Sequence, residues 1–210
     1  RLREKKESEI QPTRERGGNP LEPPLLTSRG YYYFSHLFKM KIIDNFMPKK
    51  WHRELCQTVI DNPSFPWYDN RVLLAESIVE ERHNQHFCHV LYKDRVARSQ
   101  YYSFFVPFFE QLNVDMIYRT QLNLTTCTSE IREFGYHIDN SLKRDYMKYC
   151  KTAVYYINTC DGYTGFEDGQ RVDSVANRLL LFPSDLKHTS TTTTSHRSRY
   201  VLNINYFGGN

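Results

Sequence analysis

From about residue 116 to the C-terminus, apolar residues fall in short runs separated by turn residues. The intervening stretches Asp161-Gly162, Glu167-Asp168-Gly169 and Pro183-Ser184-Asp185 are typical of tight turns. The runs predict strands at residues 116–124, 130–137, 152–158, 178–182 and 200–207. Many short strands at close spacing favour a sandwich or jelly roll.

The chain before residue 116 shows the longer apolar period of helices. A helix is expected at residues 48–61, beginning with Pro48, and a second at residues 99–112. Pro107 is expected to kink the second helix or move its start. The apolar stripes are Trp51, Leu55, Val59 and Ile60 in the first, and Phe104, Phe105, Phe108, Phe109 and Leu112 in the second. With strands at 40–46, 71–80 and 86–92, the sequence predicts a mainly β (α+β) fold in which N-terminal helices cover one sheet.

Residues 1–28 have the composition of a flexible polar tail. They carry charges of both signs, with prolines and glycines but no aromatic residue. Such a segment buries too little apolar surface to offset its ordering entropy. Its six basic residues also fit an arm that binds a partner. We expect residues 29–210 to form a single domain, which is long enough to bury a substantial core.

Composition and charge narrow the class of protein. The 28 basic and 24 acidic residues give a net charge of +4, an excess too small to predict nucleic-acid binding. No apolar run reaches the roughly 18 residues of a membrane span, so no membrane partner is expected. The five cysteines form no CxxC pair, which argues against a disulfide framework or a zinc ribbon. A reducing, cytoplasmic location is therefore predicted.

Three side chains from two separate stretches form a candidate metal site. His137 and Asp139 are two positions apart, so they share one face of an extended segment and can chelate one ion. His188, after the turn at 183–185, is the favoured third ligand. Two imidazoles and one carboxylate hold Fe(II) on one face and leave the other positions open. His196 competes for this role, but it lies so close to Arg199 that little room would remain for a cosubstrate.

A second histidine group consists of His83, His86 and His89. On a helix these rings would share a face and could bind zinc. The apolar residues between them indicate a strand instead, in which this spacing scatters the rings. We expect a surface or core-packing role for the group.

The last predicted strand separates polar from apolar side chains. Alternation places Arg199, Val201, Asn203 and Asn205 on one face. An arginine and two asparagines suit the lining of a cavity, and a guanidinium binds a carboxylate with two parallel hydrogen bonds. Arg197 has the same parity and is the alternative clamp. In the strand at 152–158, the phenol of Tyr156 is a candidate donor to the same carboxylate.

These residues resemble the iron- and 2-oxoglutarate-dependent dioxygenases, particularly the prolyl 4-hydroxylase-like branch, over about residues 40–210. The motifs are Tyr136-His137-Ile138-Asp139, Tyr155-Tyr156-Ile157-Asn158, Gly162-Tyr163-Thr164-Gly165-Phe166, Phe182-Pro183-Ser184 running to His188, and Arg199-Tyr200. The stretch Phe65-Pro66-Trp67-Tyr68 is similar to phage-type members. The resemblance implies a double-stranded β-helix, which is a jelly roll with flanking helices.

The resemblance also implies roles for single residues. It gives iron-binding, catalytic roles to His137, Asp139 and His188. Arg199 would pair with the distal carboxylate of 2-oxoglutarate, with Tyr156 as hydrogen-bond donor. The loop between His188 and Arg199, with its four consecutive threonines, is longer than the resemblance implies, which keeps Arg197 open. An aspartate at position 139 disfavours a halogenase.

Asn203 and Asn205 share the face of Arg199, and we expect them to order water, cosubstrate or substrate near the iron. Residues 140–150 follow Asp139 directly and are expected to form a lid, with residues 64–82 beside the substrate. Basic residues in this lid would favour an acidic or polar substrate.

The sequence therefore predicts an Fe(II)/2-oxoglutarate-dependent dioxygenase that consumes dioxygen, with ascorbate as a reductant. It would hydroxylate an unidentified substrate, with a prolyl or other protein side chain as the first hypothesis. One alternative is a small-molecule or nucleobase oxygenase on the same fold. Another is a non-catalytic jelly-roll binding module.

Overall fold

The computed structural model describes residues 39–70, 86–139 and 149–209, all within the compact unit His36–Asn210. The expected tail at 1–28, the expected strand at 71–80 and His83 lie outside the described residues. So do residues 140–148 of the expected lid and 71–82 of the expected substrate region. No helix in the described ranges has the length and apolarity that a membrane crossing requires.

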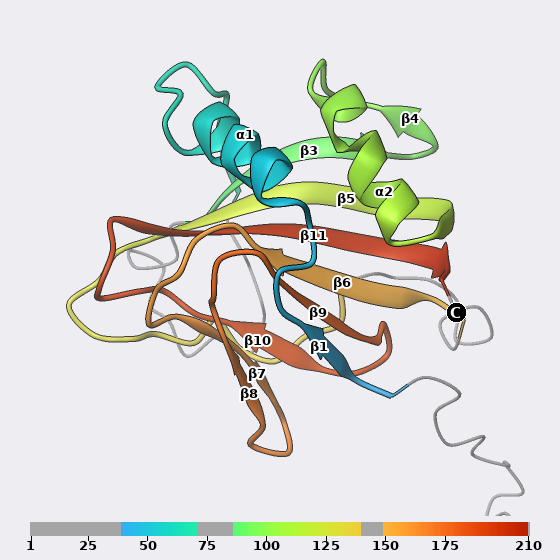
Figure 1. Cartoon of the computed structure of the whole chain (residues 1–210). Coiled ribbons are helices and arrows are strands. Elements are labelled where there is room, and N and C mark those ends of the chain that lie inside the picture. The colour runs from blue at the N-terminus through green and yellow to red at the C-terminus, as the bar shows by residue number, and fades with distance from the viewer. Residues whose placement is uncertain (1–38, 71–85, 140–148, 210) are drawn as a thin grey trace, which may run out of the picture. The chain divides into compact units, whose positions relative to one another are not determined.

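A large antiparallel sheet is the framework of this unit (Figure 1). Within the described residues its order is β1-β9-β6-β11-β5-β3-β2, with β4 paired to β3. Its strands are β1 (Lys41–Ile43), β2 (Tyr68–Asp69), β3 (His86–Lys93), β4 (Val96–Ala97), β5 (Val114–Thr126), β6 (Lys151–Tyr156), β9 (Arg178–Pro183) and β11 (Ser198–Gly208). A smaller sheet has the order β10-β7-β8. It consists of β7 (Tyr163–Phe166), β8 (Arg171–Asp173) and β10 (His188–Ser190).

Both faces of the large sheet are covered. The helices α1 (Lys49–Val59) and α2 (Val106–Gln111) lie on one face, and the small sheet lies on the other (Figure 1). On β11, Leu202 and Ile204 pack under the helices, whereas Val201 packs toward the small sheet. On β6, Tyr155 and Tyr156 divide in the same way. The central strands are apolar on both sides because each side is buried.

The first predicted helix is confirmed as α1, and the predicted strands at 86–92, 116–124, 152–158, 178–182 and 200–207 are confirmed as β3, β5, β6, β9 and β11. The strand expected at 40–46 is confirmed as the shorter β1. The helix expected at 99–112 is a 3-10 turn at Tyr102–Phe105 followed by α2. Pro107 lies in the first turn of α2, where its missing N–H is tolerated, so this proline moved the start of the helix.

The strand predicted at residues 130–137 is wrong. That segment makes only isolated bridges, from Glu133 to Thr191 and from His137 to His188. Gly135 has a φ of +91°, which interrupts the extended conformation. The strands β7, β8 and β10 were not predicted, since runs of four, three and three residues are too short to display a period.

Packing of α1 on the large sheet gives the first prediction. Leu55 of α1 is fully buried in the core between this helix and the large sheet. Leu55→Ala should lower the free energy of unfolding by about 2–5 kcal/mol, because it leaves a cavity. Urea denaturation measures this loss.

The matched control is Lys50→Ala, since the Lys50 side chain on the same helix is 89% exposed. It should change the free energy of unfolding by no more than about 0.5 kcal/mol. Similar losses in the two variants would contradict the packing described.

Candidate functional site

Backbone pairing brings His137 and His188 together across a long stretch of sequence. The N–H of His137 donates to the carbonyl oxygen of His188 at 2.9 Å, and the N–H of His188 returns a bond at 3.0 Å. Their ring centroids lie 4.8 Å apart. The ring of Phe182 packs against His188 with centroids 4.8 Å apart and supports it from the core.

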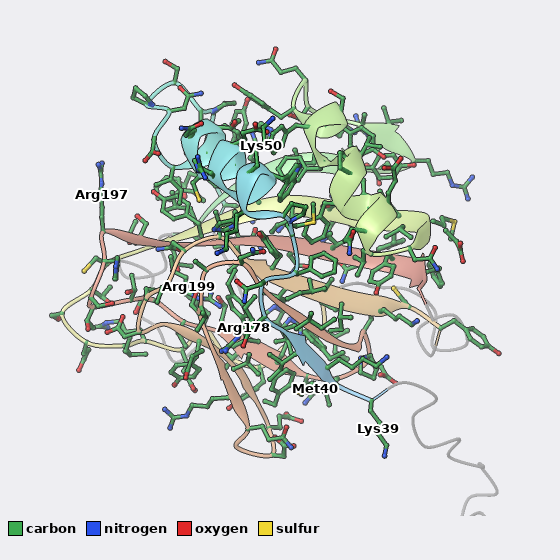
Figure 2. The ribbon with its side chains drawn as sticks, in the orientation of Figure 1. Lys39, Met40, Lys50, Arg178, Arg197 and Arg199 are labelled. Carbon is green, nitrogen blue, oxygen red and sulfur yellow. The ribbon has the colours of Figure 1, made fainter. Side chains whose placement is uncertain are left out.

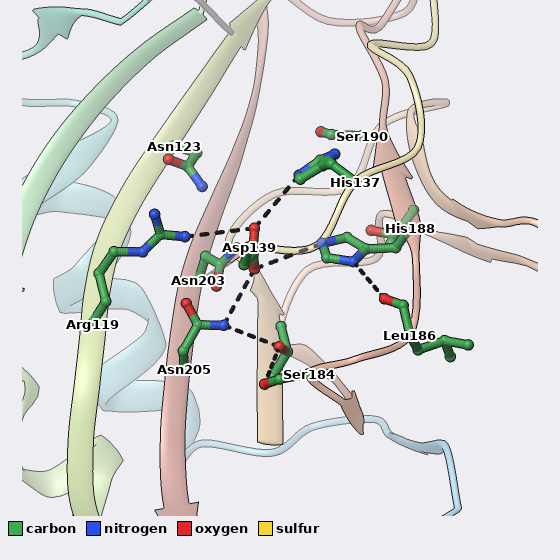
Figure 3. A network of polar contacts seen from close by, with 12 residues as sticks. Arg119, Asn123, His137, Asp139, Ser184, Leu186, His188, Ser190, Asn203 and Asn205 are labelled. Atoms are coloured by element: carbon green, nitrogen blue, oxygen red, sulfur yellow. Dashed lines mark hydrogen bonds and ion pairs between the residues drawn. The ribbon is translucent and has the colours of Figure 1, made fainter. Parts of the chain in front are cut away.

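Asp139 completes a three-residue centre (Figure 3). Its Oδ1 lies 3.5 Å from His137 Nε2, and its Oδ2 lies 3.6 Å from His188 Nε2. One potential ligand atom from each of the three residues lies within 4.8 Å of the others. The structure thus assembles the three residues that the sequence marked as a metal site.

Second hydrogen bonds fix the tautomer of both histidines. Nδ1 of His137 donates to the carbonyl oxygen of Gly135 at 3.1 Å, and Nδ1 of His188 donates to that of Leu186 at 3.2 Å. A carbonyl oxygen only accepts, so Nδ1 carries a hydrogen, and in the neutral ring that a metal requires Nε2 keeps its lone pair. Both lone pairs belong to the atoms nearest Asp139. This donor set fits a divalent ion such as Fe(II).

The carboxylate of Asp139 is buried, with a side chain that is 6% exposed. Burial would raise the pKa of Asp139, but in the metal-free site the charge of protonated His188 and hydrogen bonds from both histidines outweigh it. Together with Arg119, they hold that pKa well below its usual value. Arg119 Nη2 lies 3.5 Å from Oδ1 (Figure 3). The carboxylate is therefore ionised and able to act as a ligand.

Arg199 lines the same cavity as the three candidate ligands. It is 2% exposed, and within the described ranges no carboxylate forms an ion pair with it. Nη1 donates to Ser190 Oγ at 2.8 Å and Nη2 to Thr164 Oγ1 at 3.2 Å, whereas Nε has no partner among the described residues. A buried cation is costly unless an anion compensates it. The cavity therefore suits an anionic ligand.

The two competing residues lie elsewhere. His196 and Arg197 are exposed in the loop between β10 and β11, and Figure 2 shows Arg197 pointing away from the region of Arg199. Hydrogen bonds anchor this loop, since Asp161 accepts them from Thr193, Thr194 and Ser195. The geometry groups His188 and Arg199 with the cavity, and neither exposed residue lines it.

Tyr156 and Asn203 are placed differently from each other. The Tyr156 hydroxyl donates to Thr164 Oγ1 at 2.8 Å, and Tyr156 is not among the residues that line the cavity. Asn203 does line the cavity, but its Nδ2 donates to Asp139 Oδ2 at 2.8 Å. Direct contact of either residue with a cosubstrate stays a prediction.

Sequence reasoning missed two residues that the fold adds to the site. Arg119 on β5 reaches Asp139, and His86 on β3 lines the cavity. Burial lowers the pKa of His86 to about 4, so its imidazole is neutral at neutral pH. The alternation of β3 and β5 was visible in the sequence, but the pairing of these strands with β11 was not. His89 has the core role expected of it, bonded to Pro66 and Ser99.

Comparisons with known proteins support the fold. No protein-family profile matches the chain, and no curated protein matches it with significance. Among solved structures, an oxidoreductase of the 2OG-Fe(II) oxygenase family from Burkholderia pseudomallei matches with a TM-score of 0.57 and 12% identity, covering 81% of this chain and 87% of that one.

Two prolyl hydroxylases are also similar in structure. A Trichoplax adhaerens prolyl hydroxylase, in complex with a hypoxia inducible factor peptide fragment, matches with a TM-score of 0.55 and 22% identity over 80% of this chain and 83% of that one. A Pseudomonas putida prolyl-4-hydroxylase matches with a TM-score of 0.53 and 15% identity, covering 81% of this chain and 92% of that one. These likenesses confirm the predicted jelly-roll fold.

Gly162 provides the prediction for this region. A Cβ at Gly162 would lie 2.6 Å from the Thr192 carbonyl oxygen and 2.7 Å from Arg199 Cδ. Gly162→Ala should therefore displace the Arg199 stem and lower stability by about 1–3 kcal/mol, a typical cost of overpacking. Thermal and urea unfolding measure the loss.

Gly165→Ala is the control, because the nearest atom to its Cβ would be a Thr189 methyl carbon at 3.1 Å, which can yield by small movements. It should cost less than Gly162→Ala. The reverse order would show that the Arg199 stem is not held as described.

Proposed function

We propose that this chain is an Fe(II)- and 2-oxoglutarate-dependent dioxygenase that hydroxylates a protein or peptide side chain, with a prolyl ring as the first candidate. One observation carries the proposal: a two-histidine, one-carboxylate centre and a buried arginine, which pairs with no carboxylate of the described residues, line the same cavity. The donor set fits the metal, and the arginine fits the carboxylate of a cosubstrate. The jelly-roll fold supports the same assignment.

Each residue has a defined task in this proposal. The Nε2 atoms of His137 and His188 and the carboxylate of Asp139 would hold the ion, and three protein ligands would leave coordination positions for exchangeable ligands. When bound, Fe(II) with 2-oxoglutarate and dioxygen supplies the oxidising power for C–H hydroxylation. The chain contributes geometry, exclusion of water and orientation of both substrates.

Arg199 would bind the distal carboxylate of 2-oxoglutarate. Ser190 Oγ and Thr164 Oγ1 each accept a hydrogen bond from the guanidinium, so their own hydroxyl hydrogens are free to donate to the carboxylate. Tyr156 acts through Thr164, because the Tyr156 phenol donates a hydrogen bond to Thr164 Oγ1 and orients that hydroxyl. This arrangement offers two hydroxyl donors and one charged donor to a single anion.

The proposed substrate class draws on the two prolyl hydroxylases of similar fold, one of which is in complex with a peptide. A peptide substrate is tested by incubating the active protein with a cell lysate and searching for peptides that gain the mass of one oxygen atom. Modified prolyl peptides are the expected result. Oxidised small metabolites without modified peptides would favour the small-molecule alternative.

Turnover itself gives the next prediction. With Fe(II), ascorbate and 2-oxoglutarate, the protein should form succinate slowly even without its prime substrate. His188→Ala should abolish succinate formation, because it removes one of three ligands from a site that needs them all. His196→Ala, a histidine exposed in the nearby loop, is the control and should retain the rate. No succinate from the unmodified protein would favour a non-catalytic binding module.

The clamp gives a separate prediction. Arg199→Ala should raise the 2-oxoglutarate concentration needed for half-maximal rate by roughly 10- to 100-fold, since one charge-assisted contact contributes about 1.5–3 kcal/mol. Steady-state kinetics with varied 2-oxoglutarate measures the change. Arg197→Ala, whose side chain is exposed, should leave it unaltered. A larger effect at Arg197 would overturn the clamp assignment.

A further inference from the structure

Two asparagines on β11 hold the carboxylate of Asp139. Nδ2 of Asn203 lies 2.8 Å from Oδ2, and Nδ2 of Asn205 lies 3.3 Å from the same oxygen. An ionised carboxylate only accepts hydrogen bonds, so chemistry fixes the amide orientation of both side chains. The two amides occupy Oδ2 and leave Oδ1 with fewer hydrogen-bond partners.

Asn205 also connects Asp139 to the turn that carries His188 (Figure 3). Its Nδ2 donates to Thr152 Oγ1 at 3.0 Å, and that hydroxyl lies 2.8 Å from Ser184 Oγ. Asn205, Thr152 and Ser184 are all fully buried. Ser184 belongs to the turn that leads to Leu186, the backbone partner of His188 Nδ1. One buried polar network therefore reaches two of the three ligands.

The position of Asn205 separates it from the reacting groups. It pairs in register with Arg119 on β5 and Thr152 on β6, so both neighbouring strands hold it. It is fully buried and is not among the residues that line the cavity. Any influence of Asn205 on a bound metal must therefore pass through Asp139 or the network behind it.

We infer that Asn205 is a positioning residue: its amide fixes the Asp139 carboxylate and the His188 turn in their ligating arrangement before metal binds. The inference rests on the proposed metal site. The amide nitrogens of Asn203 and Asn205 are paired, whereas their amide oxygens have no partner among the described residues. Groups that orient metal ligands typically contribute about 10- to 100-fold to metal affinity.

Arg119 contacts the same carboxylate, but it should weaken metal binding where Asn205 strengthens it. Its guanidinium lies 3.5 Å from Oδ1 and is a cation, like the metal. A like charge at this range opposes a divalent ion, whereas the neutral amide of Asn205 does not. Loss of Asn205 should weaken metal binding, and loss of the Arg119 charge should strengthen it.

The test is titration of the metal-free protein with Co(II), followed by its visible absorption. Asn205→Leu keeps the volume but removes the amide, and it should weaken Co(II) binding by about tenfold or more. Arg119→Gln should tighten it by a few-fold. Asn158→Leu is the matched control, because that amide bonds the backbone of Ser198 and Tyr200 on β11, forms no bond with Asp139 and does not line the cavity. It should bind Co(II) like the unmodified protein.

A second measurement keeps the inference testable if Asn205→Leu folds poorly. A double-mutant cycle of Asp139→Asn and the smaller substitution Asn205→Ser, measured by urea unfolding without metal, should show a favourable coupling between the two side chains. Additive effects, or Co(II) affinity unchanged in Asn205→Leu, would overturn the positioning role. Failure of the proposed function would give a different result. In that case the unmodified protein would show no Co(II) binding, or binding that His188→Ala leaves unchanged.

Discussion

The site depends on one ionised carboxylate kept inside the protein. Burial of a charge is costly, and Asp139 is compensated by two histidines, two asparagine amides and Arg119. These groups come from β5, β10, β11 and the segment before Asp139 itself. The fold of two facing sheets brings these groups close to Asp139, and the backbone pairing of His137 with His188 closes the site.

The strand β11 organises both halves of the site. Arg199, Asn203 and Asn205 share one face of this strand, and the first two line the cavity. Arg199 is a buried cation without an acidic partner among the described residues, and Asp139 is a buried anion with several donors. The cavity thus combines a place for a metal with a place for an anion. Under the proposed function these become the iron and the distal carboxylate of the cosubstrate.

Most of this arrangement could be predicted from the sequence, because the patterns that indicate it each lie within a single helix, strand or short motif. The HxD spacing, the alternation on β11 and the apolar stripe of α1 each lie within one element. Arg119 and the link from Asn205 through Thr152 to Ser184 depend on which strands are neighbours and in what register, and no single stretch encodes that. The strand expected at 130–137 failed because Gly135 adopts a positive φ in the middle of it. The shortest strands show no period at all.

The most direct test is a crystal structure with Mn(II) and a non-reactive analogue of 2-oxoglutarate. The account predicts one metal, bound by Nε2 of His137, Nε2 of His188 and the carboxylate of Asp139. It also predicts a carboxylate of the analogue within hydrogen-bond distance of the Arg199 guanidinium. A metal bound by other residues, or an analogue carboxylate on Arg197, would contradict it.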